Sequence, residues 1–157
     1  MFALFVRQIF LKFKERCRQK IYGPVIIEKD LEKGYLVRTT NTIPALSLIC
    51  EYAGQIVRYD PDDPDYIGDD SLMDYVSIED RGYVIWPVPM CNLDRFINGI
   101  NNSKKSNNKE NLKSMTFKLN GRVHIILYAK RKIEKGEELM YNYNSGRLRE
   151  YKTSNFK

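Results

Sequence analysis

Apolar residues recur at helical spacing through the first part of the chain. They are Phe2, Phe5, Val6, Ile9, Phe10 and Phe13, and basic residues fill other positions of the same helical wheel. This pattern predicts an amphipathic helix over residues 1–21. Arg7, Gln8 and Lys12 interrupt the apolar run, so the helix cannot span a bilayer. Three roles stay open for it: packing on the domain, lying on a membrane surface or serving as a targeting segment, and facing a nucleic acid.

After Tyr22 the pattern changes to short runs rich in β-branched and aromatic residues, with Gly, Pro and Asn between them. Strands are predicted within residues 35–40, 46–57 and 83–88. Residues 114–133 form two alternating runs around Asn120-Gly121, which predicts a hairpin with a type I′ turn. The lone histidine, His124, falls inside this hairpin, so we expect a structural role for it. The sequence therefore predicts one mainly β domain with short helices, preceded by the N-terminal helix.

Charge is unevenly spread along the chain, whose formal net charge is +6. Residues 1–20 hold six basic residues and one Glu, residues 58–81 hold nine acids and two Arg, and residues 102–135 hold ten basic residues and two Glu. A bipolar surface of this kind suits a charged polymeric partner, although solvated loops give the same pattern. The acidic stretch is expected to be a loop with a short helix near Leu72 and Met73.

Cysteine and histidine are too sparse for several kinds of site. Cys17, Cys50 and Cys91 lie far apart and form no CxxC pair, which argues against a structural zinc ion and against a disulfide framework. A reducing compartment is the simplest setting for such a chain. A single histidine leaves little room for a histidine-based catalytic pair or metal centre, so no metal site is expected.

Four stretches combine glycine with polar and aromatic residues. They are "EKGYLVRT" at 32–39, "CEYAGQI" at 50–56, "DRFINGINN" at 94–102 and "IEKGEELMYNY" at 133–143. Each alone has an ordinary explanation, because Asn-Gly sequences mark turns and a Tyr-x-Tyr pair such as Tyr141 and Tyr143 packs across strands. The alternative is a pocket in which backbone groups and buried polar side chains hold a polar ligand.

In this order and spacing, the four stretches resemble the SET-domain lysine methyltransferases. They are most similar to the plant trithorax-related histone H3 lysine monomethyltransferases, with the variant "RFINGINN", an acidic stretch like "DDSLMD", a tail without zinc ligands and a closing Tyr and Phe, here Tyr151 and Phe156. The resemblance covers residues 22–157. It implies several small β-sheets with a pseudoknot, in which residues 95–102 and the C-terminal tail cross.

Together with the helical pattern at 1–21, the resemblance implies three parts of the chain and an activity. The parts are the N-terminal helix at 1–21, a SET domain at 22–144 and a tail at 145–157 that covers the cofactor. The activity is protein-lysine N-methylation that depends on S-adenosylmethionine. The implied substrate is the histone H3 tail or the nucleosome, monomethylated at the lysine of the second Ala-Arg-Lys-Ser motif, the Polycomb-type site. The implied location is the nucleus, either of its own cell or of a host cell.

Three tyrosines carry the implied chemistry. Tyr143 matches the essential tyrosine at the point of methyl transfer, Tyr141 matches the position that controls methyl number, and Tyr52 matches a tyrosine that lines the lysine tunnel. Tyrosine suits such a tunnel because its ring can face a cation and its hydroxyl can orient an amine. One departure puts activity in doubt: the family's usual Tyr-Asp-Tyr has Asn142 in place of the Asp.

The resemblance assigns further residues to the cofactor and the substrate. The cofactor residues are Lys33, Gly34, Tyr35, Arg95, Phe96, Asn98, Gly99, Ile100, Tyr151 and Phe156. Within this set, Asn98 would face the charged head of the cofactor, and backbone groups near Gly99 would meet the adenine. The peptide would contact Leu72, Met73 and Asp74, in an acidic segment whose charge complements a basic histone tail.

Two other functions stay open. The first is a catalytically inactive SET module that binds histone tails or a partner protein. The second is a small basic protein that binds nucleic acid through residues 1–20 and the basic stretch 104–132, with an affinity that depends steeply on salt. Nothing that resembles an aromatic RNA-stacking motif supports the second alternative.

Overall fold

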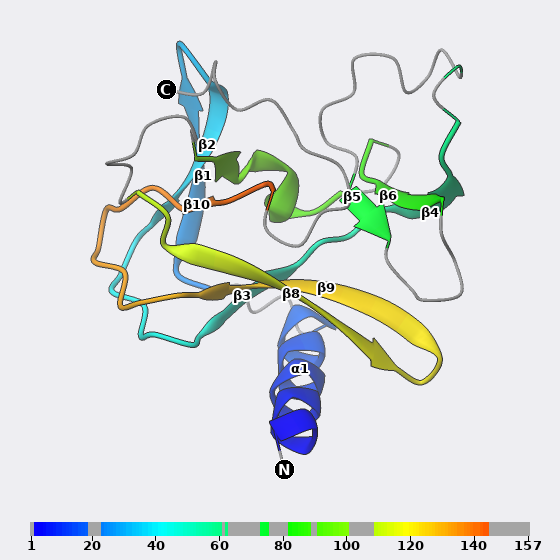
Figure 1. Cartoon of the computed structure of the whole chain (residues 1–157). Coiled ribbons are helices and arrows are strands. Elements are labelled where there is room, and N and C mark those ends of the chain that lie inside the picture. The colour runs from blue at the N-terminus through cyan, green and yellow to red at the C-terminus, as the bar shows by residue number, and fades with distance from the viewer. Residues whose placement is uncertain are drawn as a thin grey trace.

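Figure 1 shows the chain as a computed structural model. The structure describes residues 2–18, 23–60, 62, 73–75, 82–88, 91–100 and 109–144; within 2–18 and 73–75 it describes the side chains of residues 7–15 and of Met73. Helix α1 spans Phe2–Arg18, and a short 3-10 helix, η1, spans Leu93–Phe96. The strands in these ranges are β1 Val25–Asp30, β2 Gly34–Thr39, β3 Leu48–Glu51, β4 Gln55–Arg58, β5 Met73–Tyr75, β6 Tyr83–Trp86, β7 Asn98–Gly99, β8 Leu112–Leu119, β9 Arg122–Ala129 and β10 Met140–Tyr141.

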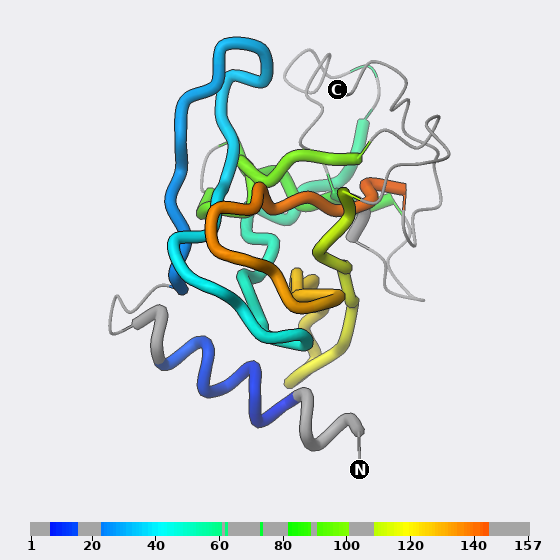
Figure 2. Tube along the Cα trace, turned by 90° about the vertical axis from the view of Figure 1, so that its left-hand side faces the viewer, coloured from blue at the N-terminus to red at the C-terminus, as the bar shows by residue number. Residues whose placement is uncertain are grey.

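The strands form several small sheets instead of one continuous sheet. Their orders are β1-β2, β10-β7, β3-β9-β8 and β4-β6-β5. Helix α1 lies on one side of the β3-β9-β8 sheet, and the β1-β2 hairpin and the β10-β7 pair lie on the other, as Figures 1 and 2 show from two directions. The predicted fold, mainly β with several small sheets behind an N-terminal helix, is confirmed.

The hairpin around Asn120-Gly121 is confirmed in its turn and its strands. β8 and β9 pair antiparallel from Leu112 opposite Ala129 to Leu119 opposite Arg122. Asn120 and Gly121 have φ values of 51° and 78°, the left-handed pair that a type I′ turn requires. Because the turn residues and both strands are neighbours in the sequence, local pattern was enough to predict this unit.

Helix α1 packs on this hairpin through one aromatic residue. The ring of Phe10, which is buried, lies 5.0 Å from the ring of Phe117 and 4.7 Å from that of His124. Nδ1 of His124 lies 2.5 Å from Oε1 of Glu51, and Nζ of Lys14 lies 3.9 Å from Oε2 of the same carboxylate. Packing on the domain is thus the role that the structure supports for α1. Of the helices described, none has the length and apolar character needed to cross a bilayer.

The structure refines one prediction of local structure and contradicts another. The run 46–57, within which strand was predicted, holds two strands, β3 and β4, which belong to different sheets. The chain bends at Gly54, where a Cβ atom would lie only 2.6 Å from the carbonyl oxygen of Trp86, so the close approach of two backbones selects glycine. The short helix expected near Met73 is strand β5 instead, because Met73 pairs with Ile85 of β6 and is buried in the core.

Candidate functional site

Two short strands from distant parts of the chain form the centre of the candidate site. β7 and β10 pair in parallel, with Met140 opposite Asn98 and Tyr141 opposite Gly99. The backbone N–H of Ile100 donates to the carbonyl oxygen of Tyr141 at 3.0 Å and extends the contact. The "RFINGINN" and "IEKGEELMYNY" stretches, which the resemblance assigned to one site, therefore lie side by side.

The side chain of Asn111 holds this pair in place. It is buried, its Oδ1 accepts from the backbone N–H of Met140 at 2.9 Å, and its Nδ2 donates to the carbonyl oxygen of Glu138 at 2.7 Å. The backbone N–H of Asn111 also donates to the carbonyl oxygen of Met140 at 3.1 Å. Two strands of two residues provide few ladder bonds, so this side chain supplies bonds that a longer strand would supply.

Two of the three predicted tunnel tyrosines are in ring contact. The rings of Tyr141 and Tyr143 lie 4.7 Å apart at 52°. The hydroxyl of Tyr143 donates to the carbonyl oxygen of Ile97 at 2.8 Å, which connects the segment after β10 to the segment before β7. Tyr52 and Tyr141 are buried in the main hydrophobic core, and Tyr143 packs against it. A shared lysine tunnel for the three tyrosines stays a prediction.

A charged cluster adjoins the β7–β10 pair. Nζ of Lys33 lies 2.7 Å from both carboxylate oxygens of Glu138, and both side chains are mostly buried. Nδ2 of Asn98 donates to Oε1 of Glu138 and to the carbonyl oxygen of Tyr35, each at 3.1 Å. The cluster presents an ammonium, a carboxylate and an amide within one small volume. Such a donor set can exchange its internal pairs for the charged groups of a zwitterionic ligand.

Aromatic and glycine residues surround this charged cluster. The ring of Phe96 lies edge-on to the ring of Tyr35, with centroids 5.4 Å apart. Tyr35 is 49% exposed, so part of its surface is left for a ligand. Gly34 follows Lys33 with a φ of 78°, a backbone conformation that glycine adopts without strain. The side chain of Arg95 is exposed, and Gly99 and Ile100 are buried.

Several predicted site residues cannot be placed at the site in this way. Tyr151, Phe156 and Leu72 lie outside the described residues, as does the side chain of Asp74. Met73 is buried in the core, and its predicted contact with a peptide stays a prediction. Among the residues that the structure describes, no group of three His, Cys, Asp or Glu side chains could hold a metal ion.

Sequence reasoning did not single out Asp94, Asn111 or Glu138, which turn out to be central. All three are polar residues beside apolar runs, and Asp94 and Glu138 lie within stretches that were quoted for other residues. Asp94 is 1% exposed, and burial raises the pKa of its carboxyl to about 7, although a hydrogen bond from the backbone N–H of Ala53 lowers it. The available signal in the sequence was a polar residue at a position that the apolar pattern predicts to be buried.

The basic stretch that suggested nucleic-acid binding is partly neutralised. Three successive cations pair with glutamates: Lys130 with Glu110, Arg131 with Glu137 and Lys132 with Glu134. Hydrogen bonds from Arg131 hold the pKa of Glu137 below its usual value, so this pair is charged at neutral pH. Because these cations already have partners, they add less to an anion-binding surface than their number suggests. Nucleic-acid contact stays a prediction.

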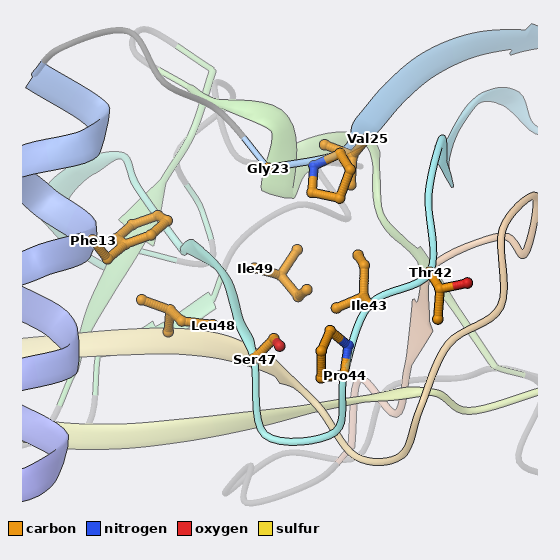
Figure 3. A pocket seen from close by; sticks show the side chains of 10 residues that line it. Phe13, Gly23, Val25, Thr42, Ile43, Pro44, Ser47, Leu48 and Ile49 are labelled. Atoms are coloured by element: carbon orange, nitrogen blue, oxygen red, sulfur yellow. The ribbon is translucent and has the colours of Figure 1, made fainter.

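A cavity of about 140 Å³ lies between α1 and the segment that leads into β3 (Figure 3). Its lining residues are Phe13, Gly23, Pro24, Val25, Thr42, Ile43, Pro44, Ser47, Leu48 and Ile49. The lining carries no charged side chain and contains none of the predicted site residues. This cavity is therefore not part of the candidate site.

Comparison with known proteins bears on the same segments. The family model described as the SET domain matches residues 34–144. A histone-lysine N-methyltransferase of Arabidopsis thaliana, ATXR6, is 38% identical over 136 residues, which cover 85% of this chain and 38% of that protein. The histone-lysine N-methyltransferase set-1 of Caenorhabditis elegans is 27% identical over 120 residues, 74% of this chain and 49% of that protein. The chain spans between 35% and 38% of the length of the plant relatives.

Solved structures agree with the fold. The crystal structure of ATXR5 in complex with histone H3.1 mono-methylated on an arginine has a TM-score of 0.83 and 31% sequence identity, and the match covers 94% of this chain and 69% of that one. A Chaetomium Polycomb repressive complex bound to S-adenosylmethionine matches with a TM-score of 0.65 and 22% identity, over 82% of this chain and 16% of that one. At that identity the likeness concerns the fold alone.

Proposed function

The chain belongs to the SET-domain family, and from this premise we propose that it is a protein-lysine N-methyltransferase that uses S-adenosylmethionine. We propose the histone H3 tail or the nucleosome as its substrate, with monomethylation at the lysine of the second Ala-Arg-Lys-Ser motif. Relatives named histone-lysine N-methyltransferases support the reaction class. The ATXR5 SET domain in complex with histone H3 supports the substrate class.

One observation supports the proposal most: the rings of Tyr141 and Tyr143 pack together at the β7–β10 pair, where Glu138 joins Lys33 and Asn98. Tyr52 is buried in the same hydrophobic core. A lysine amine must reach a methyl donor uncharged and aligned, which a narrow apolar passage lined by phenols favours. The phenol rings would contact the alkyl chain of the lysine, while the hydroxyls would accept or donate hydrogen bonds that orient its nitrogen. The space that the Tyr141 hydroxyl occupies would favour one methyl group over three.

The charged cluster fits the implied cofactor. S-adenosylmethionine, when bound, supplies an electrophilic methyl group on a sulfonium. Glu138 and Lys33 offer a carboxylate for the amino group and an ammonium for the carboxyl group of its amino-acid end, and Asn98 adds an amide donor. The rings of Tyr35 and Phe96 offer apolar surface beside them. In this proposal, residues 22–144 hold both ligands and residues 145–157 cover the adenine.

The replacement at Asn142 is compatible with an active enzyme. Oδ1 of Asn142 accepts from the backbone N–H of Asn144 at 2.9 Å, a bond that an aspartate would also accept. Asn142 therefore preserves the turn that follows Tyr141. This observation favours activity over an inactive module, and the proposed location of an active histone methyltransferase is the nucleus.

Mass spectrometry of histone H3 tail peptides, incubated with the protein and S-adenosylmethionine, tests the proposal. The expected product carries one methyl group on the lysine of the second Ala-Arg-Lys-Ser motif. A matched peptide with arginine in place of that lysine should remain unmodified. Cofactor binding is measured in parallel by calorimetry; its absence would end the proposal, and peptide binding without transfer would favour the inactive module.

A further inference from the structure

We infer that Asp94 is a positioning residue for the methyl transfer: its side chain and backbone set where Tyr52 lies relative to Tyr143. The inference rests on the proposed function, because the two tyrosines are its proposed tunnel residues. Asp94 acts through its neighbours and is not assigned a contact with either substrate.

The chain needs an anchor directly after Tyr52. The backbone N–H of Tyr52 donates to the carbonyl oxygen of Ile125 at 2.7 Å, beside the end of β3. Ala53 and Gly54 belong to neither β3 nor β4, so the N–H of Ala53 has no strand partner. It donates instead to Oδ2 of Asp94 at 3.1 Å. Asp94 thus holds the residue that follows the tyrosine.

Asn92 holds the residue that precedes the same tyrosine. Its Nδ2 donates to the carbonyl oxygen of Glu51 at 2.9 Å, and its Oδ1 accepts from the backbone N–H of Asp94 at 2.9 Å. Two side chains from the start of η1 therefore fix Glu51 and Ala53, on either side of Tyr52. These bonds fix the position of Tyr52 relative to η1 as well as relative to the β3-β9-β8 sheet.

Hydrogen bonds also connect Tyr143 to η1. The carbonyl oxygen of Asp94 accepts from the backbone N–H of Ile97 at 3.0 Å. The carbonyl oxygen of Ile97 accepts from the hydroxyl of Tyr143 at 2.8 Å. Asp94 therefore stands in a chain of hydrogen bonds that runs from Ala53 to Ile97 and on to Tyr143, and it contributes to both ends of that chain.

Burial of the Asp94 carboxyl group lowers the stability of the folded chain. It is 1% exposed, and its Oδ1 has no hydrogen-bond partner among the described residues. An unpartnered buried carboxyl oxygen lowers stability, and an asparagine would accept the same bond from Ala53 without a charge. Burial raises the pKa of Asp94 to about 7. The ionised carboxyl accepts more strongly from Ala53, so this anchor tightens as the pH rises through that value.

Other titratable or charged groups lie on the elements around η1. They are Glu51 and Tyr52 on and after β3, Tyr35 and Arg38 on β2, and Arg95 on η1 itself. Glu51 lies 2.5 Å from His124, Arg38 pairs with Glu28 at 3.0 Å, and the side chain of Arg95 is exposed. The Asp94→Asn variant decides whether a change in the Ala53 amide near neutral pH belongs to Asp94 or to His124, which contacts Glu51.

Kinetics and thermal denaturation of two variants test the inference. We expect Asp94→Ala to lower kcat roughly tenfold to a hundredfold, because the Tyr52 segment loses its anchor. Its melting temperature should fall, because the N–H of Ala53 loses its acceptor, so kcat is compared well below the melting temperature of each variant. Asp94→Asn keeps an acceptor for Ala53, so it should restore kcat to within about threefold and remove the pH dependence near neutrality. Glu28→Gln, a half-buried carboxylate on β1 that pairs with Arg38, is the matched control; it should leave kcat unchanged and lower the melting temperature only slightly.

A measurement without turnover separates this inference from the proposed function. In isotope-labelled protein, the Ala53 amide resonance should shift with a midpoint near pH 7, and the shift should be absent in Asp94→Asn. An Ala53 resonance that ignores pH, or an Asp94→Ala variant with the kcat of the unaltered protein, overturns the inference. If the unaltered protein transfers no methyl group, the proposed function fails, and an Ala53 resonance that follows Asp94 still supports the anchor.

Discussion

The β8–β9 hairpin and the β7–β10 pair hold their residues together by opposite means. In the hairpin, two strands of eight residues pair along their whole length, and the turn between them is built from the adjacent Asn120 and Gly121. In the β7–β10 pair, only Asn98 with Met140 and Gly99 with Tyr141 are in register, and the two strands are far apart in the sequence.

The difference lies in which groups provide the hydrogen bonds. The hairpin relies on backbone bonds that any similar sequence could form. The β7–β10 pair relies on side chains, namely Asn111 with its bonds to Met140 and Glu138, and Tyr143 with its bond to Ile97. A substitution in the hairpin should therefore change stability alone, whereas a substitution around β7–β10 should be able to separate function from stability.

Tyr143→Phe should have the largest effect on function. It removes the hydroxyl that donates to Ile97 and that we propose aligns the amine, so methyl transfer should fall on the order of a hundredfold to a thousandfold. The free energy of unfolding should fall by only about 1 kcal/mol, the net value of one hydrogen bond. Peptide mass spectrometry and urea denaturation measure the two quantities. Tyr128→Phe on β9 is the control; equal losses of activity in both variants would count against the proposed role.

Asn111→Ala should have the largest effect on stability. It leaves the backbone N–H of Met140 and the carbonyl oxygen of Glu138 without their buried partner, at a cost of about 4 kcal/mol for the two groups. Urea denaturation followed by circular dichroism measures this loss. Thr116→Ala, at an exposed position of β8, should change stability by less than about 0.5 kcal/mol. If the two variants were equally stable, the β7–β10 pair would not depend on Asn111.

Asp94→Asn should change how stability depends on pH. The pKa of Asp94 is raised from 3.8 to about 7 in the folded chain, so the folded state holds a proton that the unfolded state has already released. That stabilisation is fully present below about pH 4 and is lost as the pH rises through 7. Between pH 5 and pH 8 the unaltered protein should lose about 3 kcal/mol relative to Asp94→Asn. If urea denaturation gave the same pH dependence of the unfolding free energy for both proteins, the raised pKa of Asp94 would be contradicted.

Gly121→Ala should have the smallest effect and should confine it to stability. Gly121 has a φ of 78°, and a side chain in that conformation costs about 1 kcal/mol. Methyl transfer at temperatures well below the melting point should be unchanged, because the turn lies at the opposite end of β8 from Asn111, which contacts β10. Asn120→Gly, at the neighbouring left-handed position, is the control and should be nearly neutral. If Gly121→Ala lost activity without losing stability, the hairpin would not differ from the β7–β10 pair in the way described.

The elements formed by residues that are close together in the sequence were predictable. Helix α1 at Phe2–Arg18, the hairpin around Asn120-Gly121 and the strand at 83–86 follow from periodicity and turn residues. Strand was predicted within the run 46–57, but nothing local marks the change of sheet around Gly54, between β3 and β4. Only the backbone of Trp86, distant in sequence, makes that position close-packed. Met73 was mispredicted for the same reason, since its strand partner Ile85 is not a neighbour in the chain.

The candidate site was predictable as a set of residues, through family resemblance, but not as a network. Tyr52, Tyr141 and Tyr143 could be named from their motifs; the structure brings the rings of Tyr141 and Tyr143 together and buries Tyr52 in the same core. The motifs did not indicate that Glu138 pairs with Lys33 or that Asn111 supports β10. They also did not indicate that Asp94 is buried with one oxygen unpartnered.

The sequence by itself determined the class of the fold, the hairpin, the family and the identity of the aromatic residues at the site. These depend on residue order and on interactions between near neighbours, which a linear pattern records. Only the tertiary structure decided the parallel pairing of β7 with β10, the partners of the buried polar groups and the raised pKa of Asp94. These depend on which distant segments exclude water from one another, and burial is a property of the packed chain, not of any stretch of it.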